Sequence, residues 1–345
     1  MSLSNHSLPS DWKVAYVAPL FKKGSRSSPA NYRPVSLTSV VCKVCESLLR
    51  DSVVAHMNRN NLFSTGQYGF ISGKSCVTQL IDVLDDWTKS LDDGSGIDVV
   101  YTDFMKAFDK VPHERLLAKV RSYGITGDLL QWIRQFLYRR KQRVCVEGSL
   151  SDWADITSGI PQGSVLGPIL FLLYINDLPS SIAGCSVKIF ADDTKLYKAV
   201  HSLRDCDVLQ NNIDNMYNWS VTWQLHFHPD KCHVLRVGCS YLEYHYTMPK
   251  YDGGSQSLEV VNSERALGVV VDNGLNFREH VASIVSKANS ILGIIRRTFR
   301  YLDRDTVLLL YIGLSETSFG VWSASLVTYL SSGIRGYRIC ATQSN

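Results

Sequence analysis

Two adjacent aspartates, Asp192 and Asp193, are the most informative residues of this 345-residue chain. An apolar run at 187–190 precedes them and a second β-prone stretch follows at 194–197. This pattern predicts a β-hairpin with both acids at its tip. Two like charges side by side repel each other, whereas Mg²⁺ is held by one or two carboxylates together with substrate phosphates. Asp also suits turns for conformational reasons, so the pair alone is weak support for a metal site.

A third aspartate, Asp103, ends another predicted strand. Residues 97–102 are largely β-branched and apolar, and a helical-looking turn follows at 105–110. Two-metal phosphoryl transfer needs carboxylates that converge from separate elements, because the cations lie about 3.5–4 Å apart and share ligands. The alternative for Asp103 is a helix N-cap. For Asp109 we prefer the alternative, an exposed partner of a neighbouring lysine.

A glycine- and proline-rich loop at 158–168 lies in the sequence between the two acid elements and opens a predicted helix at 169–177. Glycine lets a backbone approach a ligand closely, and the first turn of a helix offers free N–H groups to phosphate. Such a loop by itself does not indicate a particular function. Its position between the acids favours phosphoryl transfer.

With these motifs the chain resembles the reverse transcriptase of non-LTR (LINE-type) retrotransposons, in particular the jockey-like group of animal elements. The similarity covers about residues 13–300. The matching stretches follow the order of the family: 19–24, 31–37, 69–70, 73–76, 101–113, 161–163, 174–179, 190–197, 229–232 and 267–269.

The resemblance implies an RNA-directed DNA polymerase, a nucleotidyltransferase that extends a DNA primer on an RNA template with dNTPs. Asp103, Asp192 and Asp193 would be its catalytic residues. With the backbone carbonyl of Phe104 they would hold two Mg²⁺ ions, with Mn²⁺ as a second possibility. Primer extension is an in-line displacement at the α-phosphate by a 3′-hydroxyl. One ion lowers the pKa of that hydroxyl and the other stabilises the leaving oxygens.

The resemblance also implies a nucleotide pocket. Pro161, Gln162 and Gly163 would line it. Phe108, five positions after Asp103, resembles the bulky residue that excludes a 2′-hydroxyl and so selects deoxynucleotides. The alternatives are an ordinary core aromatic for Phe108 and a polar residue at a helix start for Gln162.

Basic side chains would complete this pocket. Lys22 or Lys23, together with Arg33, resemble the residues that close on the triphosphate, and Lys231 resembles the lysine near the leaving pyrophosphate. Positive charge over the phosphates neutralises the charge that develops there. The charge distribution agrees, because residues 1–75 carry nine basic and three acidic side chains, although the formal net charge of the chain is only +4.

The resemblance extends to the primer end, which Leu267 and Gly268 would grip, but two residues depart from the family pattern. Ile71 stands where arginine is usual, so one basic contact of the fingers is missing. His228 stands where asparagine is usual, which puts the loop before the pyrophosphate lysine in doubt.

Composition places the protein inside the cell, in the nucleus and/or the cytoplasm. The nine cysteines are an odd number, scattered through apolar segments without a disulfide-like spacing. The segment 226–233 is rich in His and Cys, but a structural zinc site wants four regularly spaced ligands, and we prefer the reverse-transcriptase reading. No signal peptide opens the chain and no apolar run approaches the ~20 residues of a membrane span, so we expect no membrane partner.

The elements that position these residues predict an α+β fold. We expect helices at 35–57, 77–91, 113–123, 127–138 and 205–223, and strands at 143–146, 153–157, 232–237, 243–248, 258–261 and 266–271. The resemblance implies a right-hand polymerase, with fingers and palm over 13–275 and a partial helical thumb over 276–330. We expect a disordered N-terminus at 1–12 and a loose C-terminal tail at 331–345.

Two functions of different classes remain open. The first is an active RNA-directed DNA polymerase, which the intact acids favour. The second is a catalytically inactive retroelement remnant that at most binds RNA. The chain begins close to the 19–24 motif and loses the family pattern beyond residue 314. We therefore expect the endonuclease, the first fingers segment and part of the thumb to be absent, which favours the second. Neither a Walker-type loop nor a kinase motif set is present, which argues against another phosphotransferase.

Overall fold

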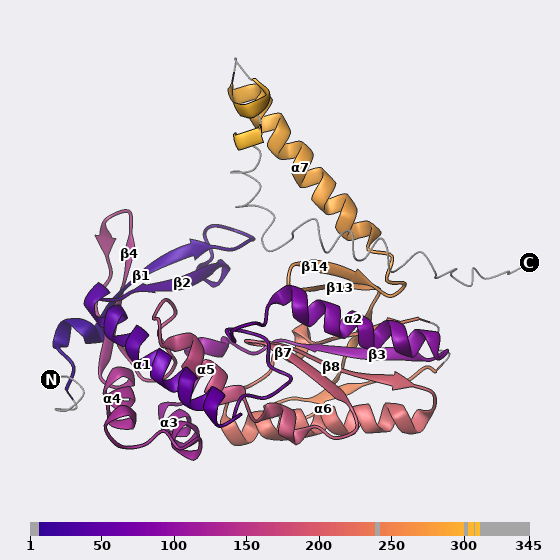
Figure 1. Cartoon of the computed structure of the whole chain (residues 1–345), viewed down its shortest axis with the longest axis horizontal. Helices are drawn as coiled ribbons and strands as arrows, with labels where there is room; N and C mark the ends of the chain where they lie inside the picture. The colour runs from indigo at the N-terminus through magenta and orange to yellow at the C-terminus, as the bar shows by residue number, and fades with distance from the viewer. Residues whose placement is uncertain (1–6, 239–241, 300–302, 307, 311–345) are drawn as a thin grey trace, which may run out of the picture.

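The computed structural model describes residues 7–310 except 239–241, 300–302 and 307. This part of the chain contains both helices and strands (Figure 1). The helices are α1 (Val40–Arg59), α2 (Cys76–Asp92), α3 (His113–Ser122), α4 (Gly127–Leu137), α5 (Gly167–Ile175), α6 (Leu203–Trp223) and α7 (Arg278–Thr298). The strands are β1 (Val14–Phe21), β2 (Tyr32–Leu37), β3 (Gly96–Thr102), β4 (Arg140–Val146), β5 (Ser149–Leu150), β6 (Ala154–Ile156), β7 (Ser186–Phe190), β8 (Asp193–Val200), β9 (His233–Val237), β10 (Thr247–Pro249), β11 (Ser255–Ser257), β12 (Glu259–Val261), β13 (Ser263–Ala266) and β14 (Val269–Asp272). The predicted mixture of helices and antiparallel hairpins is confirmed.

A sheet in the order β12-β9-β3-β8-β7 forms the centre of the molecule. Every residue of β3 is buried, because α2 covers one face of the sheet and α6 the other (Figure 1). Val99 belongs to the core that includes Trp87 of α2. Val100 belongs to the core that includes Ile213 of α6. Successive side chains of a strand point to opposite faces, so β3 contributes to both cores.

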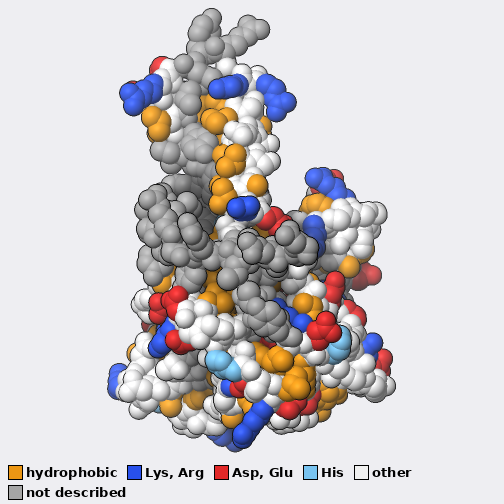
Figure 2. Space-filling model, turned by 90° about the vertical axis from the view of Figure 1, so that its right-hand side faces the viewer, with side chains coloured by type: hydrophobic (Ala, Val, Ile, Leu, Met, Phe, Trp, Pro, Cys, Tyr) orange, Lys and Arg blue, Asp and Glu red, His pale blue; other side chains and the backbone are white. Residues whose placement is uncertain are grey.

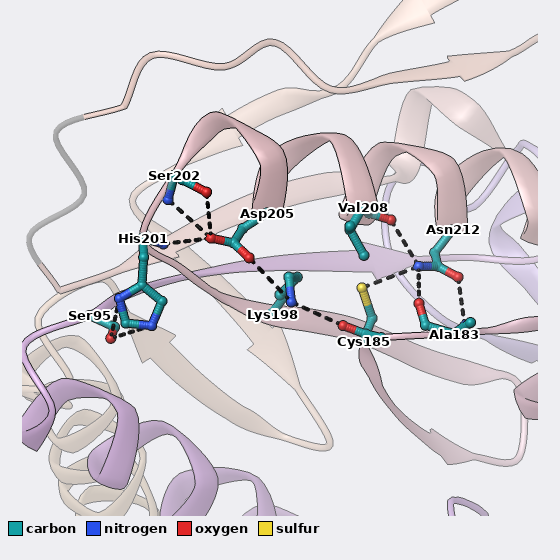
Figure 3. Close-up of polar contacts among 10 residues, drawn as sticks. Ser95, Ala183, Cys185, Lys198, His201, Ser202, Asp205, Val208 and Asn212 are labelled. Atoms are coloured by element: carbon teal, nitrogen blue, oxygen red, sulfur yellow. Dashed lines mark hydrogen bonds and ion pairs between the residues drawn. The ribbon is translucent and has the colours of Figure 1, made fainter.

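Asn212 of α6 anchors the segment that leads into β7 (Figure 3). Its amide oxygen accepts a hydrogen bond from the N–H of Ala183 at 2.9 Å, and its amide nitrogen donates one to the Ala183 carbonyl at 2.8 Å. At the start of α6, the N–H of Ser202 donates to the Asp205 carboxylate at 3.0 Å. Lys198 of β8 lies 3.4 Å from the same carboxylate. The helix predicted at 205–223 is therefore tied to both sides of the acid-tipped hairpin.

A second sheet has the order β2-β1-β4, with β5 and β6 both paired to β4. The prediction of one helix over 35–57 is wrong at its start. Residues up to Leu37 belong to β2, and α1 begins at Val40. Pro34 pairs with Pro19 of β1. Proline has no N–H, which a helix interior needs, whereas an edge strand can accommodate a residue without this donor.

The predicted strand at 266–271 is a hairpin in the structure. β13 ends at Ala266 and β14 begins at Val269. Leu267 and Gly268 form the turn between them, with φ angles of 50° and 90°. A positive φ is ordinary at glycine and uncommon at leucine, so the apolar pattern alone could not show this break.

Two other strand predictions need smaller corrections. The expected strands at 143–146 and 153–157 correspond to β4 and β6, but β6 pairs with residues 140–142 of β4, and the end of β4 pairs with β5. The expected strand at 243–248 is reduced to β10.

α7 begins after Phe277, as predicted, and points away from the sheets (Figure 1). Figure 2 shows hydrophobic side chains along this helix. Val281, Val285 and Ile294 of α7 are exposed. At the other end of the chain, Ser10–Lys13 form a 3₁₀ helix inside the segment that we expected to be disordered. The predicted tail at 331–345 lies outside the described residues, and the bounds of the thumb stay a prediction. Among the helices described, none has the length and apolar character needed to cross a lipid bilayer.

Candidate active site

Asp103, Asp192 and Asp193 come together at one edge of the central sheet. Asp103 directly follows β3, whose last residue, Thr102, pairs with Thr194 of β8. Asp193 is the first residue of β8, and Asp192 lies in the turn before it. The structure confirms the hairpin with acids at its tip. The antiparallel register then places Asp103 beside that tip.

Negative charge accumulates at this edge. Desolvation raises the pKa of Asp192 and the charge of Asp103 adds to the rise, whereas Arg33 and Lys22 oppose it. Desolvation and the charges of Asp192 and Asp103 raise the pKa of Asp193 to about 6. Because Asp193 still reaches solvent, screening limits the repulsion that it feels. Carboxylates that resist ionisation mark a place where a bound cation is favourable.

A cavity of about 400 Å³ opens beside these aspartates. Its lining includes five of the predicted site residues, which come from five separate stretches of the chain: Lys23, Asp103, Asp193, Lys231 and Leu267. His233 and Glu264 form part of the wall, with Nδ1 and Oε2 3.2 Å apart. The structure thus gathers acids, lysines and the expected primer-end residue around one space.

The segment before β9 lies against the end of β3. The N–H of His228 donates to the Asp103 carbonyl, and the N–H of Met105 donates to the His226 carbonyl, both at 2.8 Å. These two bonds flank Phe104, which forms an antiparallel bridge with Phe227. The carbonyl of Phe104 accepts neither of the two bonds. The Phe104 carbonyl is therefore compatible with the predicted role as a ligand.

In the part of the chain that the structure describes, no three His, Cys, Asp or Glu side chains form a ready metal cage. The ammonium of Lys231 lies 3.2 Å from Oδ2 of Asp103 and so stands beside one of the expected ligands. The donors are hard oxygens, which suit Mg²⁺, and Mg²⁺ commonly completes its shell with water and substrate phosphates. These residues therefore fit a divalent ion that binds together with a nucleotide.

The second sheet presents basic residues toward the aspartates. Lys22 and Arg33 lie at the β1–β2 hairpin, where the N–H of Lys22 donates to the Asn31 carbonyl at 2.8 Å. Both cations act on the carboxyl of Asp192, and Lys23 lines the cavity. Their placement agrees with the predicted contact with a triphosphate, which stays a prediction.

The N-terminus of α5 is not free for phosphate, which corrects the prediction for the loop at 158–168. The carboxylate of Glu46, on α1, accepts hydrogen bonds from the N–H groups of Val165 at 2.7 Å and Leu166 at 2.9 Å. Glu46 is fully buried. Because an anion at a helix N-terminus is favourable, the protein fills this position with its own carboxylate.

Gln162 is held from two directions. Its carbonyl accepts a hydrogen bond from the N–H of Ser36 at 2.7 Å, and its side-chain amide donates to Oδ1 of Asp109 at 2.8 Å. A Cβ at Gly163 would lie 2.7 Å from the Ser36 carbonyl oxygen, so glycine is required there. The prediction that Asp109 pairs with a neighbouring lysine is wrong. Among the described contacts, the Asp109 side chain orients a predicted residue of the nucleotide pocket.

Phe108 and Pro161 lie on the inner side of the same loop. Phe108 is half-buried and stacks on Phe171 of α5, with ring centroids 4.4 Å apart. Its carbonyl accepts a hydrogen bond from the N–H of Ile160 at 2.8 Å, and Pro161 is buried. Phe108 thus packs as a core aromatic on one side. Its role in excluding a 2′-hydroxyl stays a prediction.

Sequence reasoning missed Glu46 as a residue that shapes the site. Glu46 shares the buried stripe of α1 with Cys42, Leu49 and Val53. An acid at a core-facing position was the available signal, because a buried charge needs hydrogen-bond partners. For Asp109 the signal was weaker, since its spacing also fits an ion pair within the turn.

A mostly antiparallel sheet with carboxylates at one edge, beside a cavity that basic residues help to line, is typical of a polymerase of the right-hand type. The chain belongs to the family described as reverse transcriptase (RNA-dependent DNA polymerase), which matches residues 21–247.

Relatives of the chain come from mobile elements of insects. It is 29% identical over 287 residues to the probable RNA-directed DNA polymerase from transposon X-element of Drosophila melanogaster, covering 80% of this chain and 30% of that protein. It is 28% identical over 262 residues to the RNA-directed DNA polymerase from mobile element jockey of Drosophila funebris, covering 74% of this chain and 28% of that protein. The resemblance to jockey-like non-LTR elements is confirmed. The chain spans less than a third of the length of these relatives.

The fold is also similar to a solved structure. Apo telomerase from Candida tropicalis, truncated from the C-terminal domain, matches with a TM-score of 0.51 and 8% identity. The match covers 79% of this chain and 55% of that one. This likeness confirms the predicted right-hand polymerase fold.

Proposed function

We propose that this chain is an RNA-directed DNA polymerase that extends a DNA primer on an RNA template with dNTPs. The observation that supports it best is the meeting of Asp103, Asp192 and Asp193 at one sheet edge, opposite Lys22 and Arg33. The names of the mobile-element relatives agree with this activity. The template would be retroelement RNA, and the ions would be two Mg²⁺, with Mn²⁺ as a substitute.

The proposed reaction joins the 3′-oxygen of the primer to the α-phosphorus of a dNTP. The bond from that phosphorus to the bridging oxygen breaks, pyrophosphate leaves, and the hydroxyl proton passes to solvent. Two bound divalent ions would lower the pKa of the 3′-hydroxyl and compensate charge on the leaving oxygens. The three aspartates and the Phe104 carbonyl would hold these ions.

The remaining side chains would act on the phosphates. Lys22 and Arg33 would offset the charge of the triphosphate from the fingers side. Lys231 lines the same cavity as Asp103, so its ammonium would reach the pyrophosphate as that group departs. Gln162, held by Asp109, would contact the incoming nucleotide.

Primer extension on poly(rA)/oligo(dT) with purified protein and Mg²⁺ tests the proposal. The wild type should incorporate dTTP, and the double variant Asp192→Ala, Asp193→Ala should not. Equal background incorporation by both proteins would reject the polymerase and leave an inactive retroelement remnant. RNA binding titrated with salt would then test that second function, since affinity carried by phosphate contacts falls steeply as salt rises.

We further propose that the protein works inside the cell, in the nucleus and/or the cytoplasm. The cysteines of the described residues are all free thiols, which is usual in a reducing compartment. Microscopy of the tagged chain in insect cells tests this location. Export to the medium would contradict it.

A further inference from the structure

The turn that carries Asp192 has an unusual backbone. Ala191, the residue before it, is buried and has a φ angle of 54°. L-residues other than glycine rarely adopt this left-handed conformation, and it persists only where the surroundings hold it. The direction of the Asp192 carboxylate therefore depends on whatever holds Ala191.

The side chain of Gln67 contacts this turn from outside the hairpin. Its Oε1 accepts hydrogen bonds from the N–H of Gly69 at 2.7 Å and from the N–H of Ala191 at 3.2 Å. Gln67 is 1% exposed. Two donors meet at the same atom, so the oxygen of the amide must point to the turn. A buried N–H needs an acceptor, and Gln67 supplies it to Ala191.

The segment around Gln67 is built to bring it to this place. Gln67 forms a parallel bridge with Ile189 of β7, and backbone hydrogen bonds of 2.8 Å join Ile189 to this segment in both directions. A Cβ at Gly69 would lie 2.5 Å from the backbone nitrogen of Ala191. Only a glycine there lets the segment approach the turn closely enough for the two hydrogen bonds to form.

We propose that Gln67 is a positioning residue of the polymerase. Its side-chain oxygen holds Ala191 in the left-handed conformation and thereby directs Asp192 toward Asp103. Gln67 acts through the backbone of the turn and does not itself touch the reacting atoms. This inference rests on the function proposed above, and its test separates the two.

The test compares one substitution at two buried glutamines. Gln67→Met keeps the length of the side chain and removes the acceptor. Gln79→Met is the matched control, because Gln79 of α2 is also 1% exposed and its amide has no hydrogen-bond partner among the described residues. Gln67→Glu is the conservative variant, since it restores an acceptor oxygen at the same reach.

Hydrogen exchange of the metal-free protein gives a readout that does not depend on activity. The peptide 186–195 contains the N–H of Ala191, and mass spectrometry follows its exchange. In Gln67→Met this N–H should exchange about tenfold faster than in the wild type, because its acceptor is gone. Gln67→Glu and Gln79→Met should keep the protection of the wild type. Unchanged exchange in Gln67→Met would overturn the inference.

Kinetics give the second readout. Gln67→Met should lower kcat roughly 10²-fold and leave the KM for dTTP within about twofold, since a misplaced catalytic group slows chemistry more than binding. Gln67→Glu should recover most of the rate, and Gln79→Met should retain it. A kcat in Gln67→Met within about twofold of wild type, or no recovery in Gln67→Glu, would overturn the positioning role. A wild type that extends no primer rejects the proposed function, and hydrogen exchange then still decides whether Gln67 holds the turn.

Discussion

The aspartate edge of the central sheet and the loop at 158–168 treat negative charge in opposite ways. At the edge, desolvation and neighbouring carboxylates raise the pKa of Asp192 and Asp193. In the loop, the buried carboxylate of Glu46 accepts two backbone N–H groups, and the carboxylate of Asp109 accepts the amide of Gln162. The first region neutralises its acids only in part, through the ion pair of Lys231 with Asp103 and the nearby Lys22 and Arg33. The second region gives each acid hydrogen-bond donors.

This difference separates a region that is suited to a cation from one that is suited to keeping its shape. Uncompensated charge lowers the stability of the free protein and is relieved when a ligand binds the folded state. Acids that have hydrogen-bond donors within the protein give a rigid loop and do not need a substrate to compensate their charge. The two regions should therefore respond differently to the same kind of substitution.

The largest effect on activity should come from the sheet edge. Asp192→Asn should lower primer extension by at least about 10³-fold, because the variant loses a proposed ligand of the metal ions that would stabilise the transition-state charge. Its Tm should stay equal or rise slightly, since one of several like charges has gone. Activity assays and thermal unfolding of the same preparation measure both. A variant that loses stability together with activity would contradict the distinction drawn here.

The loop should show the reverse pattern. Glu46→Ala leaves the N–H groups of Val165 and Leu166 buried without an acceptor, and should lower the free energy of unfolding by about 3 kcal/mol. Glu46→Gln keeps an acceptor oxygen and should cost about 1 kcal/mol. Urea unfolding measures both values. Equal losses would mean that the charge, and not the hydrogen bonds, holds the loop.

A smaller effect should come from the second acid of the loop. Asp109→Leu removes the partner of the Gln162 amide, so the KM for dTTP should rise about fivefold, which corresponds to one ordinary hydrogen bond. Asp109→Asn keeps an acceptor and should change the KM less. Steady-state primer extension measures the effect. An unchanged KM in the leucine variant would show that the orientation of Gln162 does not matter to the nucleotide.

The smallest effect concerns pH. The pKa of Asp193 is about 6 in the folded protein, against an ordinary value of 3.8, so the folded state binds this proton more tightly than the unfolded state does. The free energy of unfolding, taken relative to Asp193→Asn, should therefore fall as pH rises from about 4 to about 6 and then level off. Chemical unfolding without divalent ions measures it. Mg²⁺ should weaken this fall in the free energy of unfolding. A free energy of unfolding that rises with pH, relative to Asp193→Asn, would contradict the prediction.

The part of the site that local patterns could predict is the part whose residues are neighbours in sequence. Asp192 and Asp193 lie in one hairpin, so alternation and turn chemistry were sufficient to place them. The contacts of Glu46 with Leu166 and of Gln67 with Ala191 span 120 and 124 positions, and no local pattern links such pairs. The turn at Leu267 was missed for another reason, because a non-glycine residue with a positive φ angle leaves no signature in composition.

The ion pair between Lys231 and Asp103 places a cationic side chain beside one of the expected metal ligands. Both side chains are well exposed, at 59% and 40%, and pairs of this kind are worth about 1 kcal/mol or less. An incoming divalent ion thus competes against at most about a fivefold preference for the paired state. The pair can therefore hold the Asp103 carboxylate in a defined direction and release it to a divalent ion at a small cost in free energy.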